Sequence, residues 1–121
     1  MASPSQTFGN HEKTDIREVV VNIGLDSQGN IIVDPAYFKV SKSKNQEVRW
    51  VCVMDHDHME ERPCFTVDFD KNGSPFYESQ FSSDAPVSGL ARRDVLPGPK
   101  IYEYTVQVGD KEVDPGGGVQ Q

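Results

Sequence analysis

Apolar residues in this chain alternate with polar ones over short segments, and no segment repeats them at the spacing of a capped helix. In "EVRWVCV" the residues Val48, Trp50 and Cys52 fall on one face of an extended chain. The segments "CFTVDF" and "IYEYTVQV" alternate in the same way. Because successive side chains of a strand point to opposite faces, a period of two residues indicates strands that each bury one face.

Turn-forming residues separate these segments at fairly regular intervals. The stretches "SKSKNQ", "DKNGSP" and "LPGPK" are rich in Asn, Gly, Pro and Ser, which favour turns. Pro35 cannot donate a hydrogen bond to a sheet, so the strand around it should lie at an edge or break there. About seven short strands with turns between them predict an all-β fold, a Greek-key β-sandwich.

The inward faces of these strands define the expected core. Its members are Phe38, Trp50, Phe65, Val67, Phe69, Tyr104 and Val106. The aromatic connection "SPFYESQF" either packs on this sandwich or exposes its rings to a protein partner.

The two ends of the chain lack the alternating pattern. Residues 1–15 are polar with almost no apolar anchor, so we expect a disordered N-terminal tail. Three consecutive glycines lead us to expect a flexible C-terminal tail over 116–121. Residues 16–115 are expected to form one β-sandwich domain, since the chain has 121 residues, which suits a single unit.

The acidic character of the chain excludes several classes of partner. Its formal net charge is −7, whereas nucleic acids and anionic membranes both attract clustered Lys and Arg. No apolar run approaches the roughly 20 residues of a membrane-spanning helix. The N-terminus has no basic segment followed by an apolar one, so we expect a cytoplasmic protein unless a signal peptide has been removed.

Three segments carry a resemblance to a known family. "DPAYFKVSKSKNQEVRWV" reads as a strand, a turn and a Trp-containing strand, "PCFTVDFD" as a strand after a loop, and "YEYTVQV" as an aromatic strand near the C-terminus. In this order and spacing they resemble the cupredoxins, which implies a cupredoxin-like sandwich. An immunoglobulin-like sandwich is the alternative. It is less favoured because Trp50 precedes both cysteines here, whereas immunoglobulin domains have the order Cys, Trp, Cys.

The resemblance also implies that the family's electron-transfer activity is absent. A blue-copper centre needs two His and a Cys thiolate, usually with an axial Met. The family's Cys position falls on Val106, and no Cys, His or Met follows it. The family's first His position falls on Phe65 or its neighbour Cys64. We therefore expect a cupredoxin-like domain without type-1 copper and without another cofactor.

Catalytic motifs are also missing from the sequence. No serine lies in a Gly-x-Ser-x-Gly elbow, and the glycines at 116–118 lack the Lys of a phosphate loop. The expected function is that of a non-catalytic binding or interaction domain, with another protein as the candidate partner and no indication of oligomeric state. Arg92 and Arg93 form a local basic spot that either recognises a carboxylate or pairs with nearby acids.

One loop holds most of the metal-binding side chains of the chain. Its residues with soft or borderline donor atoms are Cys52, Met54, His56, His58, Met59 and Cys64. Thiolate, thioether and imidazole groups suit Cu(I), and thiolate with imidazole suits Zn(II). His56 and His58 would lie on the same side of an extended backbone. The alternative function is therefore metal handling, with copper or zinc held by these residues.

The two cysteines have two further states that compete with a metal site. A disulfide between Cys52 and Cys64, which are 12 residues apart, would contribute about 3 kcal/mol. Strand phase argues against it, because Cys52 shares the inward face of Trp50 whereas Cys64 lies on the face opposite Phe65. We favour a polar loop with unlinked cysteines, and the disulfide and the metal site stay open as alternatives.

Overall fold

The computed structural model describes residues 16–53, 64–71 and 73–121, so the expected N-terminal tail lies outside the described residues. The described residues form β-strands and no helix, which confirms the all-β class. The strands are β1 (Arg17–Leu25), β2 (Ile31–Asp34), β3 (Tyr37–Ser41), β4 (Gln46–Cys52), β5 (Thr66–Asp68), β6 (Gln80–Ser82), β7 (Val87–Leu90), β8 (Tyr102–Glu103), β9 (Thr105–Val108), β10 (Lys111–Val113) and β11 (Gly116–Gln120). They outnumber the seven or so expected, because the segments around Pro35 and Tyr104 are each divided in two and because β6 and β11 form where no strand is expected.

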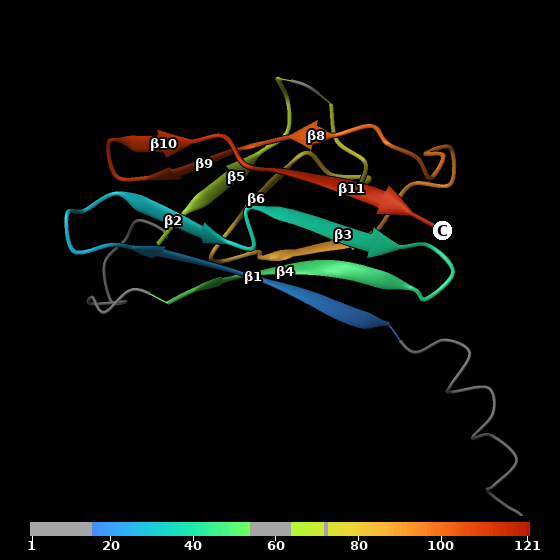
Figure 1. The fold of residues 1–121 in the computed structure, drawn as a ribbon, viewed down its shortest axis with the longest axis horizontal. Helices are drawn as coiled ribbons and strands as arrows, with labels where there is room; N and C mark the ends of the chain where they lie inside the picture. Colours follow the sequence, from blue (N-terminus) through green and yellow to red (C-terminus); the bar gives the residue numbers. More distant parts are fainter. Residues whose placement is uncertain (1–15, 54–63, 72) are drawn as a thin grey trace, which may run out of the picture.

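These strands form three hydrogen-bonded sheets, with the orders β2-β1-β4-β7, β10-β9-β5-β6 and β3-β11-β8. The backbone nitrogen of Tyr104 donates to the carbonyl oxygen of Pro115 at 2.9 Å, which joins the second and third sheets where β8 leads into β9 and β10 into β11. Figure 1 shows β1 and β4 along one side of the molecule and β9 and β11 along the other. The arrangement is consistent with a β-sandwich.

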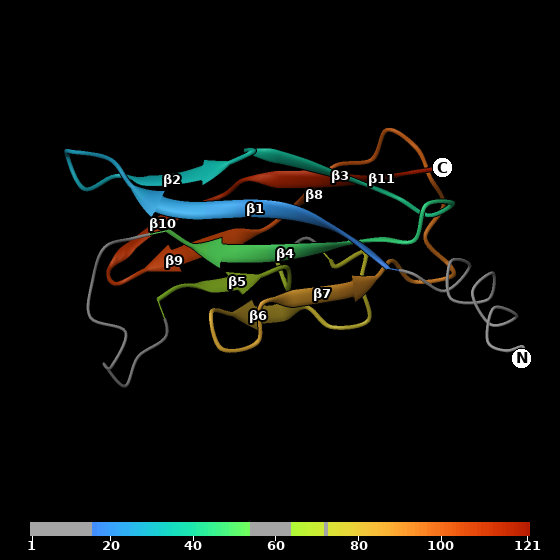
Figure 2. The same cartoon turned by 90° about the horizontal axis from the view of Figure 1, so that it is seen from below.

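Two pairs of neighbouring strands in this arrangement are parallel. β1 runs parallel to β4, and β3 runs parallel to β11. The remaining strand pairs in the described residues are antiparallel. Figure 2 shows β1 beside β4 along most of their length. Each parallel pair therefore joins strands that are not consecutive in the chain, one pair in each of two sheets.

Pro35 marks the point where the chain changes sheet. β2 ends at Asp34 in the first sheet, and β3 begins at Tyr37 in the third. The prediction that the strand breaks at Pro35 is confirmed, since proline has no N–H for the ladder. A single segment thus contributes to two sheets, and Phe38 follows the break on the inner face of β3.

All seven residues of the predicted core are buried, with at most 1% of each exposed. Phe38 lies near the centre of this core, because its ring centroid is 5.8 to 6.5 Å from those of Trp50, Phe69, Phe76 and Tyr104. Offset and edge-to-face aromatic pairs at such distances contribute more than their buried area alone. The aromatic connection packs on the sandwich, with Phe76 and Phe81 buried and only Tyr77 of its three aromatic residues exposed.

Strand β11 replaces the flexible tail that we expect over 116–121, so that expectation is wrong and the domain continues to Gln120. β11 lies between β3 and β8, and its three glycines are buried. Gly117 is paired with Phe38 in the register, and a Cβ atom on Gly117 would lie 2.2 Å from the Phe38 ring. The glycine is required here for close approach of the ring to the backbone, which composition alone does not reveal.

A side chain at Gly117 should therefore destabilise the domain. We expect Gly117→Ala to lower the free energy of unfolding by about 2 to 3 kcal/mol, because the buried Phe38 ring has no room to move away. The matched control is Gly118→Ala, whose Cβ would meet the hydroxyl end of the half-exposed Tyr37 side chain. That flexible side chain can turn aside, so we expect a change within about 1 kcal/mol. Urea unfolding measures both, and equal losses for the two variants would contradict the role of Phe38.

A buried hydrogen bond accompanies the aromatic cluster. The indole Nε1 of Trp50 donates to the hydroxyl oxygen of Tyr104 across 3.3 Å. Burial raises the pKa of Tyr104 to about 12, and the Trp50 hydrogen bond offsets a part of that rise. Because the raised pKa favours the neutral phenol, the folded state keeps its proton at a pH where the unfolded chain has already lost it.

Tyr104 should make the domain sensitive to alkaline pH. An unfolded tyrosine has a pKa of about 10, so stability linked to Tyr104 is present below pH 10 and is lost as the pH rises toward 12. Between pH 10 and pH 11 we expect the unfolding free energy to fall by about 1 kcal/mol more in the wild type than in Tyr104→Phe. Urea unfolding of both proteins at the two pH values measures this difference. Parallel losses in the two proteins would show that Tyr104 is not the group responsible.

Candidate functional site

Cys52 and Cys64 are joined by a disulfide, with an S–S distance of 2.07 Å and a Cα–Cα distance of 6.4 Å. The favoured prediction of unlinked cysteines is therefore wrong. Cys52 ends β4 in the first sheet, whereas Cys64 precedes β5 in the second. The bond thus links two different sheets at one end of the molecule.

The strand-phase argument fails because β5 is short. β5 spans only Thr66–Asp68, and Cys64 lies in a bend before it. The backbone nitrogen of Cys64 donates to Ser83 Oγ at 2.7 Å instead of joining a sheet ladder. The alternation of β5 therefore does not extend back to Cys64, and both cysteines pack partly buried against the core.

The disulfide changes the predicted metal site. Neither Cys52 nor Cys64 is a free thiolate in this structure, so the prediction that their sulfurs act as ligands is wrong for the disulfide-bonded chain. Met54, His56, His58 and Met59 lie outside the described residues. Within the described residues, no group of three or more His, Cys, Asp or Glu side chains is placed to hold a metal ion. Metal binding by the histidines and methionines stays a prediction.

The positions that the sequence resemblance assigns to copper ligands hold core side chains or the disulfide. Val106 lies in β9 opposite Val67 of β5, and both are fully buried. Phe65 is also buried, and its neighbour Cys64 is in the disulfide. None of these side chains has a free donor atom for a metal ion.

The paired acids of the β5–β6 connection have structural roles. Asp68 Oδ1 accepts a hydrogen bond from the backbone nitrogen of Asp70 at 2.8 Å. The carboxylate of Asp70 accepts hydrogen bonds from Ser79 Oγ and Gln80 Nε2. A shallow hollow of about 440 Å³ lies beside this turn, lined by Thr66, Val67, Asp68, Gln80, Phe81, Ser82 and Ala85. Because both carboxylates already bind groups of the turn, they show no arrangement for acid–base chemistry.

A smaller cavity lies at the opposite end of β4 from the disulfide. Its volume is about 270 Å³, and it is lined by Val40, Ser41, Lys42, Gln46, Leu90, Ala91 and Arg93. These residues come from the end of β3, the turn that leads into β4, the end of β7 and the segment after β7. Gln46 begins β4 and Cys52 ends it, so the strand separates this cavity from the disulfide.

The Lys42 ammonium fixes one wall of the cavity. Lys42 Nζ donates to the carbonyl oxygens of Val95 at 2.6 Å and of Arg92 and Arg93 at 3.3 Å each. The backbone nitrogen of Lys42 also donates to the carbonyl oxygen of Gln120 at 2.8 Å. One lysine therefore holds the segment after β7 against the ends of β3 and β11.

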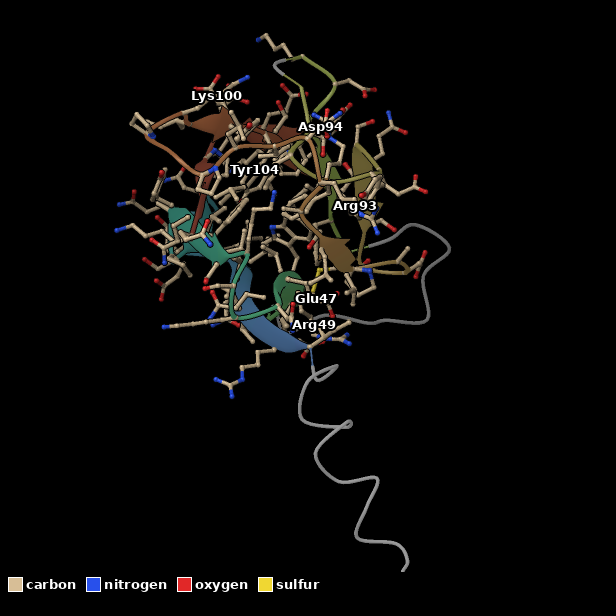
Figure 3. The ribbon with its side chains drawn as sticks, turned by 90° about the vertical axis from the view of Figure 1, so that its right-hand side faces the viewer. Glu47, Arg49, Arg93, Asp94, Lys100 and Tyr104 are labelled. Carbon is tan, nitrogen blue, oxygen red and sulfur yellow. A yellow bond between two sulfur atoms is a disulfide. The ribbon has the colours of Figure 1, made fainter. Side chains whose placement is uncertain are left out.

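Charged groups are unevenly distributed around this cavity. Arg92 pairs with Asp94 at 3.7 Å, whereas the exposed guanidinium of Arg93 has no carboxylate within ion-pair distance among the residues that the structure describes. Glu47 lies on the other face of β4 from Gln46, where burial and the nearby Glu18 raise its pKa. Figure 3 views this end and shows Arg93 well separated from Glu47. Within the described part of the chain, the cavity thus has at its edge a cationic group without a carboxylate partner.

No family model matches the chain, and no curated protein matches it. Among the described residues there is no helix long and apolar enough to cross a membrane.

Sequence reasoning found only part of this cavity. Arg93 stands out in "ARRDV" as a candidate for carboxylate recognition, but its role separates from that of Arg92 only through the contact with Asp94. Val40, Leu90 and Ala91 give no signal of their own, because an apolar residue at a strand end looks the same whether it lines a cavity or the core. The segment "SKSK" predicts a turn at Lys42, but it does not indicate which backbone carbonyls the lysine binds.

Removing the disulfide should destabilise the domain. In Cys52→Ala/Cys64→Ala we expect the free energy of unfolding to fall by about 3 kcal/mol, because the unfolded chain loses the constraint of a loop across 12 residues. Urea unfolding measures the loss, and dithiothreitol should destabilise the wild type but leave the double variant unchanged. Two alkylatable thiols in the native wild type, or equal stability of the two proteins, would contradict the disulfide.

Proposed function

We propose that the chain is a non-catalytic binding domain of cupredoxin-like architecture, without a blue-copper centre, and that the cavity beside Lys42 and Arg93 is its binding site. The observation that carries the proposal is the make-up of that cavity. Val40, Leu90 and Ala91 give it an apolar surface, and the polar residues Ser41, Lys42, Gln46 and Arg93 stand around that surface. Small-molecule sites in proteins have this composition.

The strand arrangement supports the cupredoxin-like architecture over the immunoglobulin-like alternative. The two sheets of an immunoglobulin constant-type sandwich are antiparallel. Here β1 is parallel to β4 and β3 is parallel to β11. The segment around Pro35 also contributes β2 to one sheet and β3 to another. The resemblance in sequence and this departure from the immunoglobulin pattern point the same way.

Two observations support a role other than electron transfer. Val106 and Phe65, which stand at copper-ligand positions of the family resemblance, are apolar and buried. The disulfide occupies Cys64, the neighbour of Phe65. A type-1 centre requires a thiolate and two imidazoles, and these positions provide none of them.

The chemistry of the cavity supports binding without catalysis. Ser41 has the only hydroxyl among the lining residues of the described chain, and no lining residue is a carboxylate or an imidazole. Ser41 Oγ donates a hydrogen bond to the carbonyl oxygen of Gln121 at 3.0 Å and accepts one from the backbone nitrogen of Lys44 at 3.2 Å. A hydroxyl nucleophile needs an adjacent base, and the one amine that lines this cavity, Lys42 Nζ, donates to three backbone carbonyls instead.

The size of the cavity favours a small molecule over the protein partner that the sequence suggests, and a protein partner stays a prediction.

The disulfide favours an oxidising compartment over the expected cytoplasm, because structural disulfides are rare in the cytosol. Alkylation of thiols in intact cells before lysis tests this point, since a cytosolic chain would be labelled at both cysteines.

A ligand screen by NMR tests the binding function. We expect the ¹⁵N–¹H spectrum of the full chain to show saturable shifts with some members of a library of small organic acids, amides, alcohols and amines. The shifts should cluster at residues 40–46 and 90–93, which surround the cavity. The variant Ala91→Leu, which fills the cavity, should abolish these shifts. The control Gln107→Leu places the same side chain at an exposed position that does not line the cavity, so the shifts should be unchanged. Shifts confined to other residues, or none with any compound, would contradict the proposed site.

A further inference from the structure

We infer that the ligand of this cavity is a small organic acid, in which a compact apolar group carries one carboxylate. This inference rests on the proposed binding function and goes beyond it by naming the class of ligand. Three observations carry it: the volume of the cavity, the apolar surface formed by Val40, Leu90 and Ala91, and the guanidinium of Arg93, which has no carboxylate partner among the described residues.

The volume limits the ligand to a small apolar body. A cavity of about 150 Å³ accommodates benzene in a protein core, and the cavity here is about 270 Å³. Val40 is buried, Ala91 is half-buried and Leu90 is partly exposed, so they form an apolar surface that runs from the floor to the edge. A single aromatic ring or a short alkyl chain matches this space and gains free energy from leaving water.

The charges around the cavity favour an anionic head group. Arg93 lines the cavity and has no carboxylate partner within the described residues. Lys42 adds a second positive charge close by, although its three protons already point to backbone carbonyls. The acid nearest in sequence, Asp94, pairs with Arg92. The potential at the cavity edge is therefore expected to be positive in a chain whose net charge is −7.

A carboxylate suits these groups better than a phosphate. A planar guanidinium binds a carboxylate through two parallel N–H···O hydrogen bonds. A phosphate dianion carries more charge and more acceptor oxygens than one guanidinium can satisfy. Since the donors of Lys42 are engaged, Arg93 is left as the main partner for the head group, and one negative charge matches it.

Two pairs of probes test this inference on the full chain. Phenylacetate is compared with phenylacetamide, and octanoate with octanamide, because each pair differs in charge but not in apolar body. By NMR titration we expect at least one acid to bind about tenfold more tightly than its amide. Its shifts should centre on residues 40–46 and 90–93. Acetate, which lacks an apolar body, should cause no saturable shift there.

A charge-matched pair of variants tests the role of Arg93. Arg93→Gln should weaken binding of the acid about tenfold or more, and Arg93→Lys should weaken it less. The control Lys71→Gln removes the same charge from the exposed turn after β5, so binding should change less than about twofold. Because Arg93 is exposed, we expect Arg93→Gln to fold normally. A well-dispersed NMR spectrum of the variant will verify this.

The possible outcomes separate the two proposals. Equal affinity for the acids and their amides, or unchanged binding in Arg93→Gln, would overturn the organic-acid inference while leaving a binding site at the cavity. A lack of shifts at the cavity with these probes overturns the inference, and a lack of shifts with the whole library also overturns the proposed function.

Discussion

The close approach of the Phe38 ring to the bare backbone of Gly117 is the contact on which most of this fold depends. Phe38 belongs to β3, and Gly117 to its parallel neighbour β11. From this position the ring reaches Trp50 of the first sheet and Phe69, which follows β5 of the second. One aromatic side chain therefore contacts groups from all three sheets. A larger residue at Gly117 would clash with this ring, because its Cβ atom would lie 2.2 Å from the ring.

The two ends of β4 are held by different chemistry. At its C-terminal end, Cys52 is bonded to Cys64 in another sheet, so the link between layers there is covalent. Near its N-terminal end, Lys42 Nζ donates hydrogen bonds to three backbone carbonyl oxygens. These bonds hold the segment after β7 against the end of β3. A charged lysine is an effective clamp for carbonyl groups because each of its protons can meet one acceptor. The clamp leaves room beside it, and this room is the cavity.

The features that could be predicted from the sequence are those set by neighbouring residues. Alternation identifies Val48, Trp50 and Val67 as core, since the period of a strand is local, and Pro35 breaks a strand wherever it lies. The role of Gly117 could not be predicted, because a glycine in the sequence is equally compatible with a flexible tail and with a strand that packs closely against a ring. The strand-phase prediction against the disulfide is wrong because the alternation of β5 does not reach Cys64, which lies in a bend outside the strand.

The cavity lies beyond such local rules because two runs far apart in the chain, 40–46 and 90–93, form it, and the two arginines beside it look alike in sequence. In the structure, Arg92 is half-buried and pairs with Asp94, whereas Arg93 is exposed and lines the cavity. The cavity and the disulfide lie at opposite ends of β4, which has seven residues, or roughly 20 Å of extended chain. At that separation, screening by salt leaves little interaction between charges at the two ends. Charges near the disulfide therefore have little effect on ligand binding at the cavity.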